Sequence, residues 1–270
     1  MIRDVTIGQF FPGNSVIHKL DSRLKILLVI AGIIALFVVS NIFTLMLFML
    51  VILFLYKFAK ISLRLIFKSV KPLLFIIIFT SIINIFFTEG HIIFEFGIFK
   101  ISKEGIILSL MLILRILNMV MFSSLLTYTT SPIELTYALE KLMKPLEFFN
   151  VPVSDISMMM TISLRFVPTL IQEIDKIILA QKSRGAKLDT GNVIQKIKSF
   201  IPIIIPLFVS AFRAADDLAI SMECRCYNSG KGRTSMKQLK IQKSDVLVLG
   251  ASVIFLVAIF CLDKFLKMSF

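Results

Sequence analysis

The sequence contains no tryptophan, only three cysteines, two histidines and 17 acidic residues among its 270 positions. It has no His-Glu-x-x-His pair, no Ser-His-Asp set and no Gly-x-x-x-x-Gly-Lys-[Ser/Thr] phosphate loop. The odd cysteine count, with Cys224 and Cys226 expected on the cytosolic side, argues against a disulfide framework. Cys-x-Cys without a nearby histidine is a weak metal signal, and small packing residues around Arg225 explain it better. We therefore expect no catalytic residue, no cofactor and no metal ligand.

The chain is rich in hydrophobic residues, which occur in long runs. Hydrophobic residues make up 57% of it and the mean hydropathy is +0.91, which excludes an ordinary soluble domain and indicates an integral membrane protein. A net charge of +13 would suggest nucleic acid in a soluble chain. Here the cations flank long apolar runs, so membrane orientation and contact with anionic membrane lipid explain them, and no nucleic-acid partner is expected.

The apolar runs predict about five transmembrane helices. The run from Leu24 to Tyr56 would be about 50 Å long as one helix, too long for a hydrocarbon core of about 30 Å. Ser40-Asn41 is its natural break. Five cations and no acid lie between Lys57 and Lys71, which predicts a cytoplasmic segment and a cytoplasmic N-terminus. The expected spans are 24–40, 42–57, 72–87, 105–128 and 245–262, with an external loop at 88–104.

Two polar residues in this region receive structural interpretations. Arg115 lies near the middle of the fourth span, where a cation is a functional hypothesis by default. The alternative, slightly favoured, is that Arg115 faces the bundle and bonds backbone carbonyls or Asn118. His18 is isolated, which favours a surface or packing role over a ligand role.

After Thr130, apolar residues recur at helical spacing between charges, which predicts long amphipathic helices outside the spans. Ser131-Pro132 and Ser154-Asp155 are expected to begin two of them, and Pro202 and Pro206 should kink or restart the third. The expected helices are 132–149, 155–183 and 193–223. The predicted fold is therefore an all-α integral membrane protein with three regions: residues 1–128 with four spans in the membrane, a cytosolic coupling-helix region 129–243 and a final transmembrane helix 244–270.

Two segments of the coupling-helix region repeat a motif 41 positions apart. Residues 175–191 and 216–232 match Asp with Asp, Arg184 with Arg225, and Gly with Gly. Each places an arginine between small residues at an expected helix C-terminus. An arginine there already interacts favourably with the helix dipole, by about 0.3–1 kcal/mol, and needs no partner. Two copies at matched spacing favour docking to a two-lobed or two-subunit partner, because the guanidinium fork suits carboxylates and carbonyls.

The combined motifs resemble the transmembrane T component of energy-coupling factor (ECF) vitamin transporters over nearly the whole chain. Small residues, Ser183, Cys224 and Cys226, stand where the family usually has alanine or glycine, and Ser22 stands where it often has proline. The residues that carry the resemblance are Gly8-Gln9-Phe10, Pro12-Gly13, His18-Lys19-Leu20-Asp21, Arg23-x-Lys25, both arginine motifs, the run Met222 to Tyr227, and Gly232-Arg233-Thr234.

The resemblance implies a multi-pass scaffold subunit in the bacterial cell membrane. It would couple ATP hydrolysis by two ABC-type ATPases to vitamin or micronutrient uptake through a substrate-binding S component. The ATPases would dock on Ser183, Arg184, Gly185, Cys224, Arg225 and Cys226, and ATP would be hydrolysed by these partners, so this chain itself is not expected to be an enzyme. A dedicated T component of a cobalt or nickel importer is the alternative.

Two other classes of function fit the residues poorly. A membrane enzyme acting on lipid would need a cluster of buried acids or histidines, which the sequence does not show. A stand-alone carrier would be expected to have broken helices with polar centres, and these are hard to find here.

Overall fold

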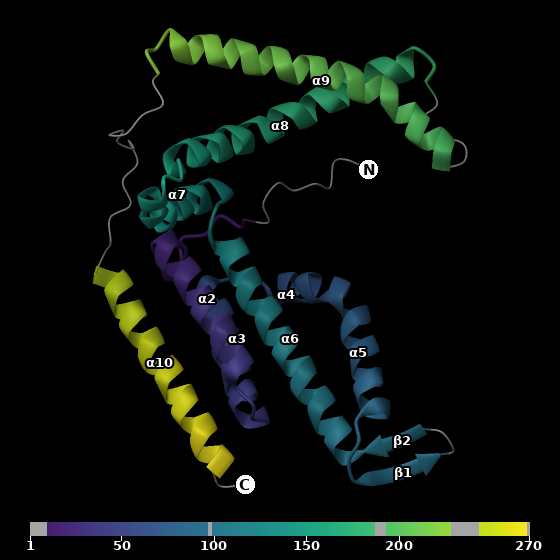
Figure 1. Ribbon diagram of the computed structural model, residues 1–270, viewed down its shortest axis with the longest axis vertical. Helices are drawn as coiled ribbons and strands as arrows, with labels where there is room; N and C mark the ends of the chain where they lie inside the picture. The colour runs from purple at the N-terminus through teal and green to yellow at the C-terminus, as the bar shows by residue number, and fades with distance from the viewer. Residues whose placement is uncertain (1–9, 97–98, 187–192, 228–242, 269–270) are drawn as a thin grey trace. The chain divides into compact units, whose positions relative to one another are not determined.

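A computed structural model describes residues 10–96, 99–186, 193–227 and 243–268 (Figure 1). Expectations that concern Gly8-Gln9, Gly191 and the basic segment 231–242 lie outside the described residues. The chain divides into two compact units, one formed by residues 8–142 with 239–270 and the other containing residues 143–238.

The first unit holds most of the helices. They are α1 (Val16–Lys19), α2 (Ser22–Val38), α3 (Ile42–Ala59), α4 (Leu63–Val70), the 3-10 turn η1 (Lys71–Leu73), α5 (Leu74–Phe87), α6 (Lys103–Thr129), α7 (Pro132–Met143) and α10 (Lys243–Met268). A hairpin of β1 (Ile92–Phe96) and β2 (Phe99–Ser102) joins α5 to α6. The second unit contains the 3-10 helix η2 (Lys144–Phe149), α8 (Val153–Ser183) and α9 (Val193–Glu223).

Among the described residues, four helical segments are long and apolar enough to cross a membrane: α3, the continuous stretch Arg64–Phe87, α6, and most of α10. This confirms the predicted helical membrane protein. The predicted break at Ser40-Asn41 is also confirmed, because α2 ends at Val38 and α3 begins at Ile42. With 17 residues, or about 26 Å, α2 stands at the lower limit for a crossing helix.

Helix α2 runs parallel to α10 over nearly its whole length. At the first end, the Asp21 backbone N–H donates to the Asp245 carboxylate at 3.1 Å. At the other end, the N–H groups of Ser40 and Asn41 donate to the Asp263 carboxylate at 3.2 and 3.1 Å. Because α10 includes a membrane-crossing segment, α2 extends through the same depth as that span.

Helix α6 is the centre of this unit and packs against α2, α3, α4 and α5. At Gly32 on α2, an added Cβ would lie 2.3 Å from the Phe122 ring, so a larger residue there would force this side chain of α6 to shift. The buried Tyr56 hydroxyl donates to the Met121 carbonyl at 2.8 Å. Other core side chains are Leu36, Leu45, Phe48, Ile52, Leu114, Leu125 and Tyr128.

Several predicted boundaries were wrong. In addition, the connecting stretches 88–104 and 57–71 hold a β-hairpin and α4, elements that were not predicted. The helix expected to begin at Ser154-Asp155 begins at Val153 with Pro152 as its N-cap. The helix expected over 132–149 changes to 3-10 geometry after Met143, where Pro145 removes a backbone donor. The prediction for Pro202 and Pro206 is confirmed in its first form, because α9 stays continuous through both prolines and bends (Figure 1).

Candidate functional site

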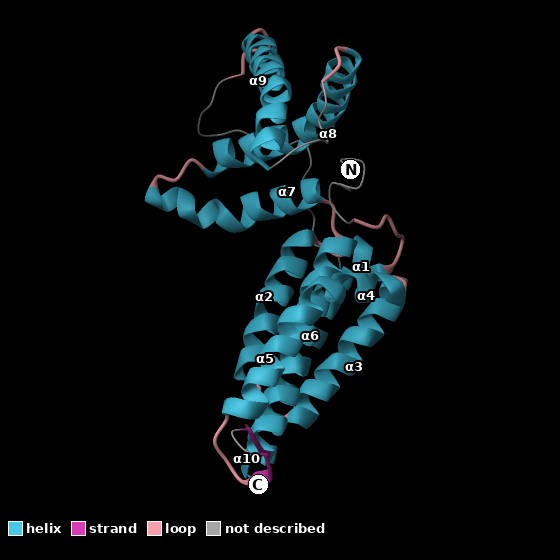
Figure 2. Ribbon diagram, turned by 90° about the vertical axis from the view of Figure 1, so that its right-hand side faces the viewer, coloured by secondary structure: helices cyan, strands magenta, loops and turns pink. Residues whose placement is uncertain are grey.

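The two long helices of the second unit run in opposite directions. The Gln181 amide, near the end of α8, donates to the Pro202 carbonyl in the first third of α9 at 3.3 Å. Glu173, earlier on α8, lies 3.5 Å from the Ser210 hydroxyl, later on α9. Figures 1 and 2 show the crossing pair. The C-termini of α8 and α9 therefore lie at opposite ends of the pair.

Helix α8 ends in a Schellman turn. Arg184 is the C-cap, and Gly185 follows in the left-handed region with φ 83°. The Gly185 N–H donates to the Lys182 carbonyl and the Ala186 N–H donates to the Gln181 carbonyl, both at 3.0 Å. These two bonds satisfy carbonyls that the last helical turn would otherwise leave unpaired.

Helix α9 ends in the same turn, shifted by 41 positions. Arg225 occupies the position of Arg184, and Cys226 follows in the left-handed region with φ 54°. The Cys226 N–H donates to the Glu223 carbonyl at 2.8 Å, and the Tyr227 N–H donates to the Met222 carbonyl at 3.0 Å. The repeat seen in the sequence is thus a repeat of backbone hydrogen bonding.

All six predicted docking residues are exposed, but the two triplets are not brought together. From Pro202, which contacts the end of α8, to Arg225 the chain advances 23 residues, or about 35 Å along α9. Each end therefore offers one guanidinium, placed by a backbone turn and flanked by small residues. The exposed residues are Ser183, Arg184, Gly185, Cys224, Arg225 and Cys226.

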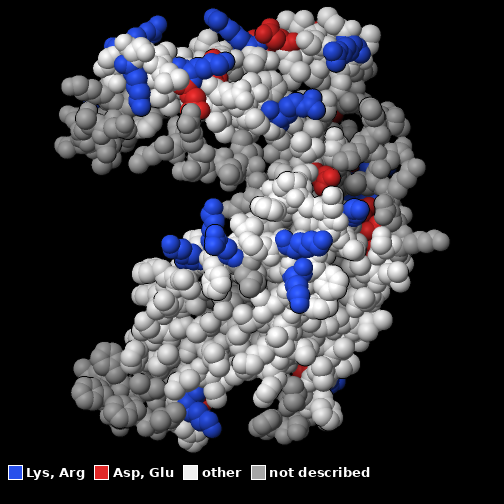
Figure 3. Space-filling model, turned by 180° about the vertical axis from the view of Figure 1, so that it is seen from behind, with Lys and Arg blue, Asp and Glu red and all other residues white. Residues whose placement is uncertain are grey.

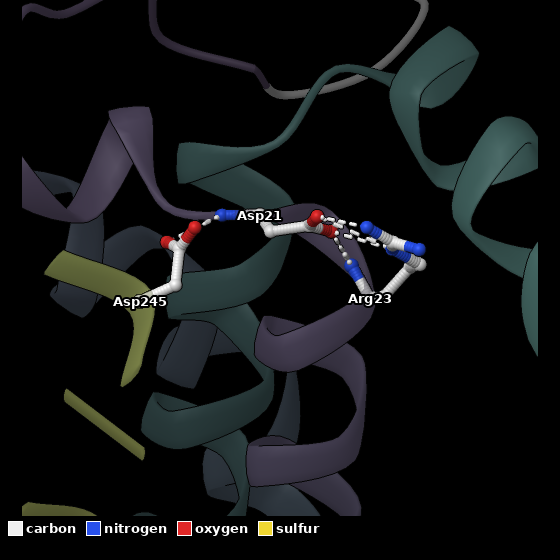
Figure 4. A network of polar contacts seen from close by, with 3 residues as sticks. All are labelled: Asp21, Arg23 and Asp245. Carbon is white, nitrogen blue, oxygen red and sulfur yellow. Dashed lines mark hydrogen bonds and ion pairs between the residues drawn. The ribbon is translucent and has the colours of Figure 1, made fainter. Parts of the chain in front are cut away.

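Sequence reasoning missed the role of a polar network in the first unit (Figure 4). Asp21 caps α2 by accepting from the Arg23 backbone N–H at 2.9 Å and from the Arg23 guanidinium at 2.6 Å, and its own N–H donates to Asp245. Burial opposes ionisation of Asp21, but the hydrogen bonds and charge of Arg23, with the charge of Lys25, outweigh it and hold the pKa of the carboxyl below its usual value. The network joins α2 to α10.

Lys25 is a second junction, and it is buried. Its Nζ donates to the His18 carbonyl, the Thr129 carbonyl and the Thr130 hydroxyl at 3.0–3.3 Å. The central residues of both junctions lie in the run from His18 to Lys25. In the sequence, this run indicated the family resemblance but predicted no structural role.

Arg115 and His18 make structural contacts of the kind that the sequence favoured for them. Arg115 Nη2 donates to the Val39 carbonyl at 2.6 Å, and Asn118 donates to the Leu45 carbonyl at 3.0 Å, so α6 holds the α2–α3 turn. His18 packs between Phe11 and Ser15 through hydrogen bonds at both ring nitrogens. Among the described residues, no three His, Cys, Asp or Glu side chains form a group that could hold a metal ion.

The apolar spans define a multi-pass membrane protein, and two long antiparallel helices with equivalent ends accompany them. The sequence model of the CbiQ family, described as cobalt transport protein, matches residues 13–236.

Similar proteins extend over nearly the whole chain. An energy-coupling factor transporter transmembrane protein EcfT from Ruminiclostridium cellulolyticum is 49% identical over 95% of this chain and 96% of its own length. Proteins of the same name from Clostridium kluyveri and Acidaminococcus fermentans are 45% and 41% identical, covering 92% and 99% of this chain and 92% and 98% of their own lengths. The chain belongs to this family of transmembrane components of energy-coupling factor transporters.

Proposed function

We propose that this chain is the scaffold subunit that couples two ABC-type ATPases to uptake of a vitamin or other micronutrient through a substrate-binding S component. The observation that carries the proposal is the antiparallel α8–α9 pair, which presents the same arginine-capped turn at each of its two ends. Two equivalent ends about 35 Å apart suit two copies of one partner. ATP is hydrolysed by the ATPases.

The chemistry of each end supports docking into a groove. A Schellman turn places the arginine where the backbone bends away, and small neighbours let a partner approach closely. The guanidinium can donate to carboxylates or carbonyls in two directions, which a lysine cannot do in the same fixed geometry. Residues 129–243 would form the coupling region between the membrane-embedded regions, residues 1–128 and 244–270.

Helix α9 also offers a surface for the S component. Ile203, Leu207, Ala211 and Leu218 form its more buried stripe. A neighbouring side exposes large apolar side chains, with Phe208 60% and Phe212 66% exposed. An exposed apolar stripe of this kind is typical of a protein or membrane contact. We assign this side to the S component; the other members of the stripe are Ile201, Ile204 and Ile205.

A dedicated metal-ion importer is the second candidate, because the matching family description names cobalt transport. The relatives that match over almost their full length are named for energy-coupling factor transporters instead. They favour the first candidate. In both, the N-terminus is placed in the cytoplasm because five cations and no acid follow the second predicted span.

The test is the double variant Arg184→Glu and Arg225→Glu. Reversing both charges should abolish co-purification of the ATPases and abolish uptake, while the amount of the chain in the membrane stays normal. Lys176→Glu with Lys198→Glu is a matched control on exposed positions of the same two helices. Retention of both ATPases by the Arg184 and Arg225 variant would refute the proposed docking site.

A further inference from the structure

Helix α4 has two chemically different faces. On the inner face Ile66 and Val70 are buried. Ser69 on the same side donates to the Leu65 carbonyl at 3.2 Å and is hydrogen bonded to the Tyr128 hydroxyl of α6. These contacts fix the rotation of α4 about its axis, so its outer face is set by the bundle.

The outer face carries cations around an aromatic side chain. Arg64, Lys68 and the C-cap residue Lys71, which begins η1, recur about once per turn, and with Phe67 they occupy an arc of about 100°. All four are exposed, Phe67 by 75%. Figure 3 shows Lys and Arg side chains gathered over this area of the molecule, left of centre.

This face is also hollowed, and among the described residues no acid compensates its charge. A pocket of about 480 Å³ is lined by Ser62, Leu65, Phe67 and the three cations. The sequence holds no acid from Lys57 to Lys71. None of the three cations forms an ion pair with another residue within the portion of the chain that the structure describes. Three like charges within two turns repel one another unless an anion lies between them.

The membrane depth of this cationic face follows from the helical segment that continues from α4. The stretch Arg64–Phe87 is one apolar segment long enough to cross a membrane, and the cations occupy its first two turns. Helix α4 lies across the end of α5, to which η1 joins it (Figure 1), and Phe75, exposed by 78%, lies in the first turn of α5. The cations therefore lie at the end of a span, at the depth of lipid headgroups, and the apolar face of α5 continues from there toward acyl-chain depth.

We infer that the outer face of α4 binds the phosphate of an anionic membrane phospholipid, with Arg64, Lys68 and Lys71 holding the headgroup and Phe67 contacting its acyl region. An acidic protein surface would satisfy the cations equally well, but it would leave Phe67 and the adjoining apolar face of α5 unexplained. Amphipathic helices with cations beside phenylalanine are typical of the membrane interface. The inference does not depend on the proposed docking function.

The test uses the purified full chain in mixed micelles containing phosphatidylglycerol or phosphatidylcholine, with bound lipid counted by native mass spectrometry. The wild-type chain should retain phosphatidylglycerol at least about tenfold more than phosphatidylcholine, since each cation near an anionic surface contributes roughly 1 kcal/mol. The variant Arg64→Gln, Lys68→Gln and Lys71→Gln should lose this preference. The control Lys144→Gln, Lys176→Gln and Lys198→Gln, which removes the same charge elsewhere, should keep it.

A charge-conserving variant separates electrostatics from folding. Arg64→Lys with Lys68→Arg and Lys71→Arg should bind like the wild type, and equal loss in this variant would contradict the inference. Unchanged phosphatidylglycerol retention in the glutamine variant would overturn it. So would full displacement of the lipid by millimolar inorganic phosphate, which would make this a free-phosphate site. Loss of a co-purifying protein with lipid retention unchanged would make it a protein contact and would equally overturn the inference.

Discussion

The residues that end α8 and α9 adopt the same backbone but carry different side chains. Gly185 tolerates a positive φ, whereas Cys226 holds φ 54° with a Cβ. A left-handed conformation costs a non-glycine residue about 1–2 kcal/mol. The turn at Cys226 therefore has a conformational free-energy penalty that the turn at Gly185 does not have.

Exchanging the residue types should change stability in opposite directions. Cys226→Gly should stabilise the end of α9 by about 1 kcal/mol, and Gly185→Ala should destabilise the end of α8 by a similar amount. Among the described residues other than its chain neighbours, none comes within 4 Å of the position that a Cβ on Gly185 would occupy, so crowding by these residues adds nothing to the second effect. Amide hydrogen exchange of the last turns measures both. Equal exchange in both variants and the wild type would contradict the assigned conformations.

His18 should make stability depend on pH below neutrality. Burial lowers the pKa of His18 and the charge of Lys25 lowers it further, against the hydrogen bond with the Phe11 carbonyl. The folded state thus binds the proton less readily than the unfolded state, where the pKa is about 6.5. The contribution of neutral His18 to the free energy of unfolding is therefore complete above the pKa of the unfolded state. It is lost as the pH falls through the lower pKa of the folded state.

The measurement is thermal unfolding of the detergent-solubilised chain between pH 8 and pH 5. The midpoint should fall as the solution is acidified, and His18→Gln should flatten the curve in this range. A His18→Gln curve that keeps the wild-type slope would show that another group is responsible.

At the scale of elements, both ends of α10 are attached by carboxylates to α2 and α3. Asp263 is the stronger attachment, because it accepts from the Ser40 and Asn41 backbone N–H groups and from the Thr44 hydroxyl. Asn41, the N-cap of α3, makes no side-chain capping bond. Asp263 of α10 thus accepts from the N–H groups that lead into α3 and caps the turn before this helix.

Removing this cap should be costly. Asp263→Ala leaves one buried donor, on Thr44, and two part-buried backbone donors without this acceptor, each worth up to about 1–3 kcal/mol, so we expect a loss of about 2–4 kcal/mol in unfolding free energy. Asp263→Asn keeps one acceptor and should cost less. Asp217→Ala, on the exposed side of α9, serves as the control and should change little. Denaturant titration in mixed micelles measures the difference, and equal values for Asp263→Ala and Asp217→Ala would refute the capping role.

The elements that sequence could predict are those with a strong local signal. Continuous apolar runs gave the spans, and the small-Arg-small motifs gave the ends of α8 and α9 to within a residue. Helix α4 was missed because its cations resemble a loop, although Ile66 and Val70 are spaced one turn apart. The hairpin was missed although β-branched and aromatic residues surround Gly97 in the sequence. Asp245 and Asp263 gave no local signal, since their partners are more than 200 residues away.

For the whole molecule, the family and the class of function followed from the sequence because motifs from both halves of the chain occur together. The antiparallel order of α8 and α9 could not be predicted, since it depends on contacts such as that between Gln181 and Pro202. That order decides the function proposed here. Parallel helices would place both arginines at one end, where a single partner could take them.

Thiol cross-linking tests that claim most directly, because Cys224 is exposed beside Arg225 and Ser183 is its equivalent beside Arg184. With Cys226→Gly and Cys261→Ala removing the other thiols, one variant keeps Cys224 and the other combines Ser183→Cys with Cys224→Ala. In the assembled transporter, each variant should capture one ATPase subunit, and a chain carrying both thiols should capture two. Capture by only one of the two ends, or capture of no ATPase by either, would contradict the account.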